Sequence, residues 1–175
     1  TQTLQVIEEF KEDFEVVILS AHANSQLLLQ QVSKYNPQIV ILTEEKSYNI
    51  VKNALSGKQI KVLYGPEGIL AALEEIQVDL VVGAISGAAG IKPTLKALEL
   101  GIDVALANKE TIVAAGALVR QIQEKTGARI LPVDSEHSAI MQCLEQEKQA
   151  VAKIILTASG GPFRNYSKEE LKKVT

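Results

Sequence analysis

The sequence has 175 residues and a mass of 18.9 kDa, enough for one ordinary domain, or for one domain and the start of a second. Its 18 Lys and Arg against 21 Asp and Glu give a net charge of −3, which is not the basic balance of a nucleic-acid-binding protein. Cys143 is the single cysteine, which excludes an internal disulfide and a multi-cysteine metal cage.

The longest stretch without a formal charge, residues 16–33, is too rich in Ser, His, Asn and Gln to span a bilayer. We expect no secretory signal before the predicted fold. We therefore expect a cytoplasmic protein without membrane or nucleic-acid partners.

Short apolar, β-branched runs alternate with amphipathic segments along the chain. Most of these runs are apolar at consecutive positions, which is typical of parallel strands covered on both faces. Strands are expected at residues 16–19, 39–42, 61–63, 80–82, 104–106, 129–133 and 153–156. Helices are expected at residues 1–11, 25–34, 66–76, 93–100, 111–125, 138–147 and 168–174. The alternation predicts an α/β fold with a Rossmann-like, doubly wound parallel sheet.

The two ends of the sequence affect the predicted domain organisation. A Rossmann-type unit begins with a strand and a glycine-rich turn, and neither is found before the first predicted helix. We therefore interpret residues 1–133 as a dinucleotide-binding domain that lacks its first strand and glycine-rich loop. Residues 134–175 are interpreted as the start of an α/β catalytic domain.

A polar segment, residues 20–25, follows the first predicted strand. As the second strand of a dinucleotide fold, this strand ends near the adenosine ribose, where an acidic residue selects NAD. His22 and Asn24 offer hydrogen-bonding groups and no acid, which favours NADP over NAD. The alternative is a polar turn in which Asn24 or Ser25 caps the next helix.

A second polar segment, Asn108 to Glu110, follows the predicted strand at residues 104–106. Asn108 suits the cap of the next helix, which places Lys109 at the positive end of that helix. An ammonium held there indicates an anionic partner, such as a substrate oxygen, a phosphate or a carboxylate. The alternative is an exposed ion pair between Lys109 and Glu110.

Two carboxylates, Asp134 and Glu136, lie just past a predicted buried strand, where open α/β sheets bind ligands. They offer hard oxygen ligands for Mg²⁺ or Mn²⁺ and leave most of an octahedral shell open. The alternative is that Asp134 or Ser135 caps a helix and Glu136 lies in its first turn. The spacing alone favours this capping interpretation, and His137 is then an ordinary helix residue.

A fourth segment, residues 157–164, contains Ser159 followed by two glycines and a proline. A glycine turn lets backbone amides approach an anion closely, so Ser159 and its neighbours suit a phosphate. The alternative is a plain loop.

Taken together, these segments resemble the family of 1-deoxy-D-xylulose 5-phosphate reductoisomerases, and the resemblance runs nearly end to end. The matching strings are GAISGAAG at 83–90, LANKE at 106–110, LPVDSEH at 131–137 and TASGGPFR at 157–164. The strings LPVDSEH and SGGPFR are long and family-specific, so they outweigh a lone GxGxxG motif.

The resemblance implies an NADPH-dependent oxidoreductase of the non-mevalonate isoprenoid pathway that also requires Mg²⁺ or Mn²⁺. Members of the family isomerise the carbon skeleton of a phosphosugar and reduce the resulting aldehyde to 2-C-methyl-D-erythritol 4-phosphate. They are homodimers, and we expect a bacterial cytoplasmic protein rather than a plastid one. The family's glycine-rich loop, remaining metal-binding glutamate, lid and phosphate-binding cluster are not in this sequence. Residues 1–175 alone are therefore expected to be inactive.

The resemblance also implies a role for each matching residue. The implied metal ligands are Asp134 and Glu136. The implied substrate contacts are Lys109, Ser135, Glu136 and Ser159, with Lys109 and Glu136 as catalytic residues. The implied cofactor contacts are Asn24, Asn108 and Glu110. Where the family commonly has Gly-Lys, this chain has His22 and Ala23, which removes a cation near the 2′-phosphate of NADPH.

Two other functions stay open from the residues alone. One is a different NADP-linked α/β dehydrogenase, such as a relative of the aldehyde or homoserine dehydrogenases, in which Asp134 and Glu136 bind no metal. The other is a non-catalytic nucleotide-binding module, which would bind a nucleotide without metal-dependent turnover.

Overall fold

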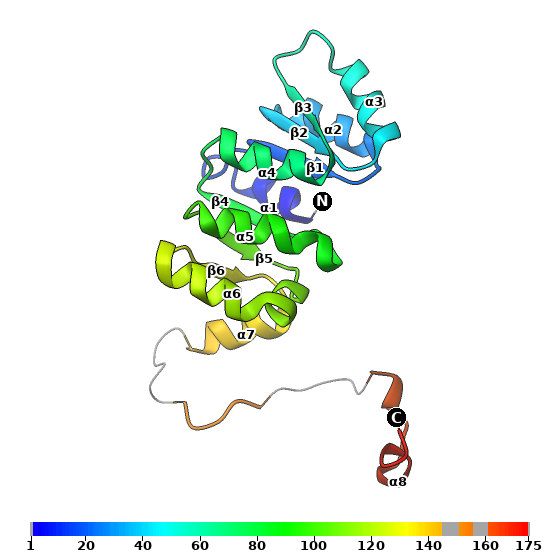
Figure 1. Ribbon diagram of the computed structural model, residues 1–175, viewed down its shortest axis with the longest axis vertical. Coiled ribbons are helices and arrows are strands. Elements are labelled where there is room, and N and C mark those ends of the chain that lie inside the picture. The colour runs from blue at the N-terminus through cyan, green and yellow to red at the C-terminus, as the bar shows by residue number, and fades with distance from the viewer. Residues whose placement is uncertain (1, 145–150, 156–160, 175) are drawn as a thin grey trace. The chain divides into compact units, whose positions relative to one another are not determined.

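The structure is a computed structural model that describes residues 2–144, 151–155 and 161–174 (Figure 1). The chain divides into two compact units, residues 1–133 and residues 134–175. None of the helices described is long and apolar enough to cross a membrane.

The first unit alternates helices and strands as the sequence predicts, with one further helix, α3, that the sequence analysis did not predict. Its elements are α1 (Gln2–Glu9), β1 (Ile18–Ala21), α2 (Ser25–Tyr35), β2 (Ile39–Leu42), α3 (Glu45–Ala54), β3 (Lys61–Tyr64), α4 (Gly65–Glu75), β4 (Leu80–Gly83), the 3₁₀ helix η1 (Gly87–Gly90), α5 (Ile91–Glu99), β5 (Asp103–Leu106), α6 (Glu110–Thr126) and β6 (Ile130–Pro132). The second unit contains α7 (Ser135–Leu144), the 3₁₀ helix η3 (Gly161–Phe163) and α8 (Lys168–Leu171).

All strand pairs of the first unit are parallel, which confirms the predicted α/β class. The strands form two three-stranded sheets, ordered β1-β2-β3 and β4-β5-β6, where the sequence predicts one. β1 and β4 are edge strands of these sheets. The sheets are separate because no strand in the described part of the chain pairs with both of them. In each sheet the carboxyl ends of all three strands lie at the same edge, where α/β proteins bind ligands.

The strand β2 shows why consecutive apolar residues predict a parallel strand covered on both faces. All four of its residues are buried. Val40 and Leu42 pack with Leu28, Val32, Val51 and Leu55 from the region of α2 and α3. Ile39 and Ile41 pack on the opposite face with Ala72 of α4. Alternate side chains therefore enter two separate apolar cores, as the strand geometry requires.

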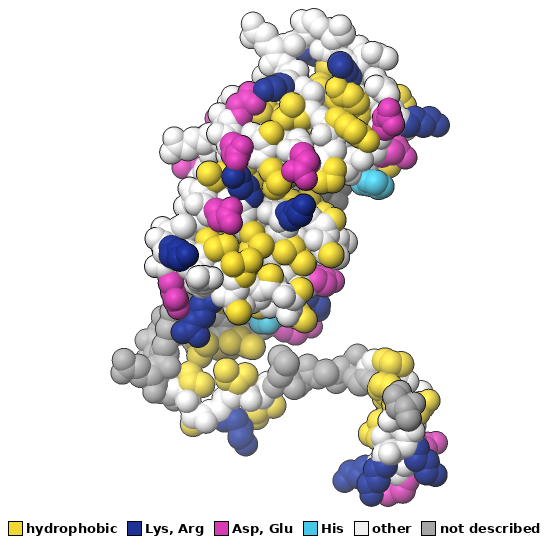
Figure 2. Space-filling view, viewed as in Figure 1, with side chains coloured by type: hydrophobic (Ala, Val, Ile, Leu, Met, Phe, Trp, Pro, Cys, Tyr) yellow, Lys and Arg dark blue, Asp and Glu magenta, His cyan; other side chains and the backbone are white. Residues whose placement is uncertain are grey.

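The second sheet has a core of its own, built from β5 and the helices that cover it. Val104 and Leu106 pack with Ala97 and Leu98 of α5 and with Val119 and Ile122 of α6. Figure 1 shows α4, α5 and α6 side by side across the strands. On the face drawn in Figure 2, positive and negative side chains are interspersed over these helices, and an ion pair joins Lys96 of α5 to Glu74 of α4.

The prediction of a strand at residues 153–156 is wrong for the part that the structure describes. Residues 153–155 form no strand, and Leu156 lies outside the described residues. Ile154 is 58% exposed and Ile155 is 78% exposed. A strand is stable only beside a neighbour, and no described segment pairs with this one.

Candidate functional site

The turn after β1 places two of the polar residues that the sequence singles out, His22 and Asn24. Asn24 caps α2, because its Oδ1 accepts a hydrogen bond from the backbone N of Leu27 at 3.0 Å. This is the capping role that the sequence left open. The Asn24 side chain is exposed, and its contact with a cofactor stays a prediction. His22 Nδ1 lies 2.7 Å from Thr43 Oγ1, within hydrogen-bonding distance.

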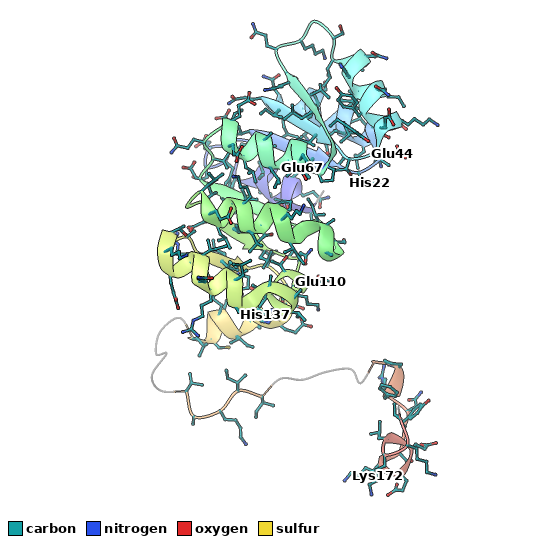
Figure 3. The ribbon with its side chains drawn as sticks, viewed as in Figure 1. His22, Glu44, Glu67, Glu110, His137 and Lys172 are labelled. Carbon is teal, nitrogen blue, oxygen red and sulfur yellow. The ribbon has the colours of Figure 1, made fainter. Side chains whose placement is uncertain are left out.

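The turns after β1 and β2 are tied together by residues that the sequence analysis missed. The buried Ser47 hydroxyl lies 2.6 Å from the carbonyl oxygen of Ala23 and 2.5 Å from Glu44 Oε2. The backbone N of Glu44 donates to the carbonyl oxygen of His22 at 3.0 Å. Figure 3 shows His22 and Glu44 close together. Thr43, Glu44 and Ser47 lie just past the buried strand β2. That position was the signal in the sequence that could have identified them.

The turn after β5 separates one buried residue from two exposed ones. Asn108 is only 4% exposed, while Lys109 and Glu110 are exposed. Asn108 Nδ2 donates to the carbonyl oxygens of Ile85 and Gly87, the latter at 2.8 Å. Asn108 Oδ1 accepts from the backbone N of Thr111 at 3.1 Å, as a helix-capping side chain does. The amide group of Asn108 is thus occupied by the protein itself.

Lys109 lies at the N-terminus of α6, as predicted. Within residues 2–144 it has no ion-pair partner within 4.0 Å, so the alternative pair with Glu110 is not formed. The positive end of the helix disfavours an ammonium group there, whereas an anionic ligand would stabilise it. The exposed Lys109 is therefore suited to bind an anion.

The second unit begins with the predicted acidic segment. Asp134 Oδ1 accepts from the backbone N of His137 at 3.0 Å, and Asp134 Oδ2 lies 2.8 Å from His137 Nδ1. Ser135 Oγ donates to Glu136 Oε2 at 3.0 Å. Asp134 therefore occupies the capping position of α7, which the spacing favoured.

The same two carboxylates fit a divalent cation by the chemistry of their donors. Carboxylate oxygens are the hard ligands that Mg²⁺ prefers, and two of them supply part of an octahedral shell. Among the described residues no group of three or more His, Cys, Asp and Glu side chains could hold a metal ion. The metal-binding role of Asp134 and Glu136 therefore stays a prediction.

The predicted phosphate-binding segment is described only in part. Ser159 lies outside the described residues, so its substrate role stays a prediction. Gly161 has a φ of +53°, the left-handed conformation that glycine adopts readily, and it begins η3. The structure thus places a glycine turn at the end of this segment.

Comparison with known proteins connects these strand ends to one family. Residues 1–116 match the model of 1-deoxy-D-xylulose 5-phosphate reductoisomerase, and residues 130–175 match the model of its C-terminal domain. The chain belongs to the 1-deoxy-D-xylulose 5-phosphate reductoisomerase family. All four segments that carry the resemblance in the sequence lie within these two matches.

Curated relatives extend the match over the whole chain. The reductoisomerase of Desulfitobacterium hafniense strain DCB-2 is 49% identical over 175 residues, which are 100% of this chain and 46% of that protein. The reductoisomerase of Thermoanaerobacter sp. strain X514 is 47% identical, again over 100% of this chain and 46% of the relative. The chain therefore spans about half the length of the curated relatives it matches.

Solved structures agree with the fold. The reductoisomerase of Zymomonas mobilis in complex with NADPH matches 99% of this chain and 46% of its own, with a TM-score of 0.86 and 38% identity. A reductoisomerase in complex with NADPH, fosmidomycin and magnesium matches 99% of this chain and 45% of its own, with a TM-score of 0.84 and 34% identity. These similarities confirm a Rossmann-like α/β region of the reductoisomerase fold.

Proposed function

We propose that this chain forms the NADPH-binding region and the opening of the catalytic region of an enzyme that converts 1-deoxy-D-xylulose 5-phosphate to 2-C-methyl-D-erythritol 4-phosphate. The match of both units to reductoisomerase family models carries the proposal. Further support comes from the neighbouring structures, which are complexes with NADPH and with magnesium. The reaction isomerises the carbon skeleton of the phosphosugar and then reduces the resulting aldehyde.

In this proposal residues 1–133 bind NADPH. The turn after β1 contains His22 and Asn24 and no acid, so it can hydrogen-bond a 2′-phosphate without repelling it. Asn24 and the exposed Glu110 are the proposed contacts to the cofactor. Asn108 is a further proposed contact to the cofactor, and its side chain donates to the carbonyl oxygens of Ile85 and Gly87 in the loop after β4.

Residues 134–175 contribute to the metal and substrate site in this proposal. Asp134 and Glu136 would hold Mg²⁺ or Mn²⁺, which as a Lewis acid polarises the vicinal oxygens of the substrate. Ser135 and Ser159 are the proposed hydrogen-bonding contacts to the substrate. Glu136 contacts both metal and substrate, and Lys109 binds a substrate oxygen with its ammonium group.

The test is a steady-state assay with a protein of the relatives' length that contains this chain, called here the family-length enzyme. We expect NADPH oxidation that requires both 1-deoxy-D-xylulose 5-phosphate and a divalent cation. Oxidation of NADPH with another carbonyl substrate but not this one would indicate a different NADP-linked dehydrogenase. NADPH binding without any turnover would indicate a non-catalytic nucleotide-binding module.

The proposal extends to assembly and location. We expect the family-length enzyme to be a homodimer in the bacterial cytoplasm, and sedimentation equilibrium tests the first of these points. Because this chain spans about half of its relatives' length, we expect residues 1–175 alone to show no turnover. Reductoisomerase activity of residues 1–175 by themselves would contradict that expectation.

A further inference from the structure

We propose that Ser47 is a positioning residue for the preference of NADPH over NADH, because its hydroxyl holds the Glu44 carboxylate away from the 2′-phosphate. The inference rests on the proposed function, which assigns the turn after β1 to that phosphate. The turn after β1 contains no acid, but the neighbouring turn after β2 does, and this acid must be kept from the phosphate. Ser47 is buried in α3, so it acts through Glu44 and not by contact with the cofactor.

The first observation is that the turns after β1 and β2 are bonded to each other. The two strands pair in parallel with Ala21 opposite Leu42, so both turns begin at the same edge of the sheet. The backbone N of Thr43 donates to the carbonyl oxygen of Ala21 at 3.2 Å, and the backbone N of Glu44 donates to that of His22 at 3.0 Å. Glu44 is therefore a direct neighbour of the turn proposed to face the 2′-phosphate, as Figure 3 shows for His22 and Glu44.

The second observation is the position of the Ser47 hydroxyl between these two turns. Ser47 is 4% exposed, and its hydroxyl has one hydrogen to donate. That hydrogen is shared between Glu44 Oε2 at 2.5 Å and the carbonyl oxygen of Ala23 at 2.6 Å. One acceptor belongs to the turn after β2 and the other to the turn after β1. Loss of the hydroxyl therefore releases the Glu44 carboxylate from the contact between the two turns.

The third observation is that α3 does not hold the Glu44 carboxylate by capping. Glu44 occupies the N-cap position of α3, yet its side chain forms no capping hydrogen bond in the part of the chain that the structure describes. Glutamate is not one of the preferred N-cap residues, whereas Asn24 at the matching position of α2 does cap its helix. The bond from Ser47 is therefore what fixes the direction of the Glu44 carboxylate.

The charge of Glu44 connects this direction to cofactor choice. Glu44 is only partly exposed, and salt screens a partly buried charge less than an exposed one. A released carboxylate can turn towards the 2′-phosphate of NADPH, and two negative charges in proximity repel each other. NADH has no 2′-phosphate, so its binding is not affected by this repulsion. Loss of the Ser47 hydroxyl should thus weaken NADPH binding selectively, which a general loss of stability would not do.

The test compares the Kd for NADPH with the Kd for NADH in variants of the family-length enzyme, measured by isothermal titration calorimetry. Ser47→Ala removes the hydroxyl and leaves Glu44 charged. We expect the Kd for NADPH to rise about fivefold or more, while the Kd for NADH stays within about twofold of wild type. Because the effect is electrostatic, the ratio of variant to wild-type Kd for NADPH should shrink between about 0.01 M and about 1 M salt.

A second substitution separates the charge of Glu44 from the packing of Ser47. Glu44→Gln removes the charge and keeps the length of the side chain. When it is combined with Ser47→Ala, no carboxylate is left to repel the phosphate, so the Kd for NADPH should return to within about twofold of wild type. The matched control combines Ser47→Ala with Glu45→Gln, which removes the charge of an exposed neighbour in the first turn of α3 and should keep most of the loss.

A third substitution allows for the case in which Ser47→Ala does not fold. Ser47→Cys keeps a side chain of similar shape but offers only a weak donor, so it should show the same selective loss of NADPH binding.

Three results would overturn the proposal. One is a Kd for NADPH in folded Ser47→Ala that stays within about twofold of wild type. Another is a rise that is equal for NADPH and NADH, or that persists when Glu44→Gln is added. The third is failure of both Ser47→Ala and Ser47→Cys to fold, which would give Ser47 a structural role only. Absence of turnover by the wild-type enzyme would instead contradict the proposed function, while its two Kd values could still be compared with those of the variants.

Discussion

Asp134 and His137 are joined at two points, with Asp134 Oδ1 3.0 Å from the His137 backbone N and Asp134 Oδ2 2.8 Å from His137 Nδ1. One residue in the first turn of α7 therefore orients both oxygens of the carboxylate. Each carboxylate oxygen has two lone pairs, so it can accept one of these bonds and still ligate a cation. Capping and metal binding, which the sequence presents as alternatives, are compatible in this arrangement. A hydrogen-bonded carboxylate is also typical of metal ligands.

The metal proposal predicts the effect of Asp134→Asn in the family-length enzyme. The amide oxygen of the variant can still accept from the His137 backbone N, so the cap and the fold are kept. The lost negative charge should raise the Kd for Mn²⁺ at least about tenfold. Titration followed by electron paramagnetic resonance measures this Kd without reference to activity. Glu169→Gln, an exposed carboxylate on α8, is the matched control and should change nothing. An unchanged Mn²⁺ affinity in Asp134→Asn would remove this residue from the ligand set.

The cofactor proposal predicts the effect of an acid at the end of β1. The wild-type enzyme should have a higher kcat/KM with NADPH than with NADH, because no acid follows this strand. His22→Asp places a carboxylate beside the proposed position of the 2′-phosphate, and like charges in contact cost several kcal/mol. We therefore expect the NADPH-to-NADH ratio of kcat/KM to fall by about tenfold or more.

The control for this measurement carries the same added charge elsewhere. Asn53→Asp places a carboxylate at an exposed position in the last turn of α3 and should leave the ratio unchanged. A wild-type enzyme that uses NADH as well as NADPH, or a His22→Asp variant with an unaltered ratio, would refute the assignment of this turn to the 2′-phosphate.

Asp103 and Arg129 give a prediction about stability and pH. The Arg129 side chain hydrogen-bonds Asp103 Oδ2, with Nε at 2.8 Å, and the Arg129 backbone N donates to Oδ1 at 2.7 Å. These bonds hold the pKa of Asp103 below its usual range, the side-chain bond most of all. A carboxyl pKa that is lower in the folded state stabilises the fold above the unfolded pKa, and this contribution is lost as pH falls through the folded pKa.

The variant Asp103→Asn should therefore have a lower Tm than the wild-type protein at neutral pH. The difference should shrink as the pH falls through the range in which Asp103 titrates. Thermal unfolding across a pH series measures it, with Asp13→Asn, an exposed acid outside this pair, as the control. A Tm difference that stays constant or grows towards acid pH would show that the charge of Asp103 does not stabilise this contact.

The sequence predicts best those elements whose buried positions form a clear pattern of apolar residues. The strand β2 was predicted at its observed bounds because all four residues are apolar and buried on two faces. The helix α3 was missed, because only two of its ten residues, Ser47 and Val51, are buried, and one of them is polar. Residues 153–155 were predicted as a strand because apolar content alone does not reveal whether a neighbouring strand exists.

For the site, too, the sequence pattern located the polar segments but did not show how their side chains pack. The sequence located the polar segments after β1, after β5 and before α7, since chemistry-bearing residues follow strands at the ligand-binding edge. It could not tell which member of Asn108, Lys109 and Glu110 turns inward. That choice depends on Gly83 and Gly90, which approach Asn108 only in the folded chain.

The central claim is most directly tested by measuring the product of the family-length enzyme together with the cofactor consumed. With 1-deoxy-D-xylulose 5-phosphate, NADPH and Mg²⁺, we expect one molecule of 2-C-methyl-D-erythritol 4-phosphate for each NADPH oxidised. Without the metal we expect no product and no oxidation of NADPH. Oxidation of NADPH without this product, or no oxidation by a folded enzyme that binds NADPH and Mg²⁺, would contradict the account.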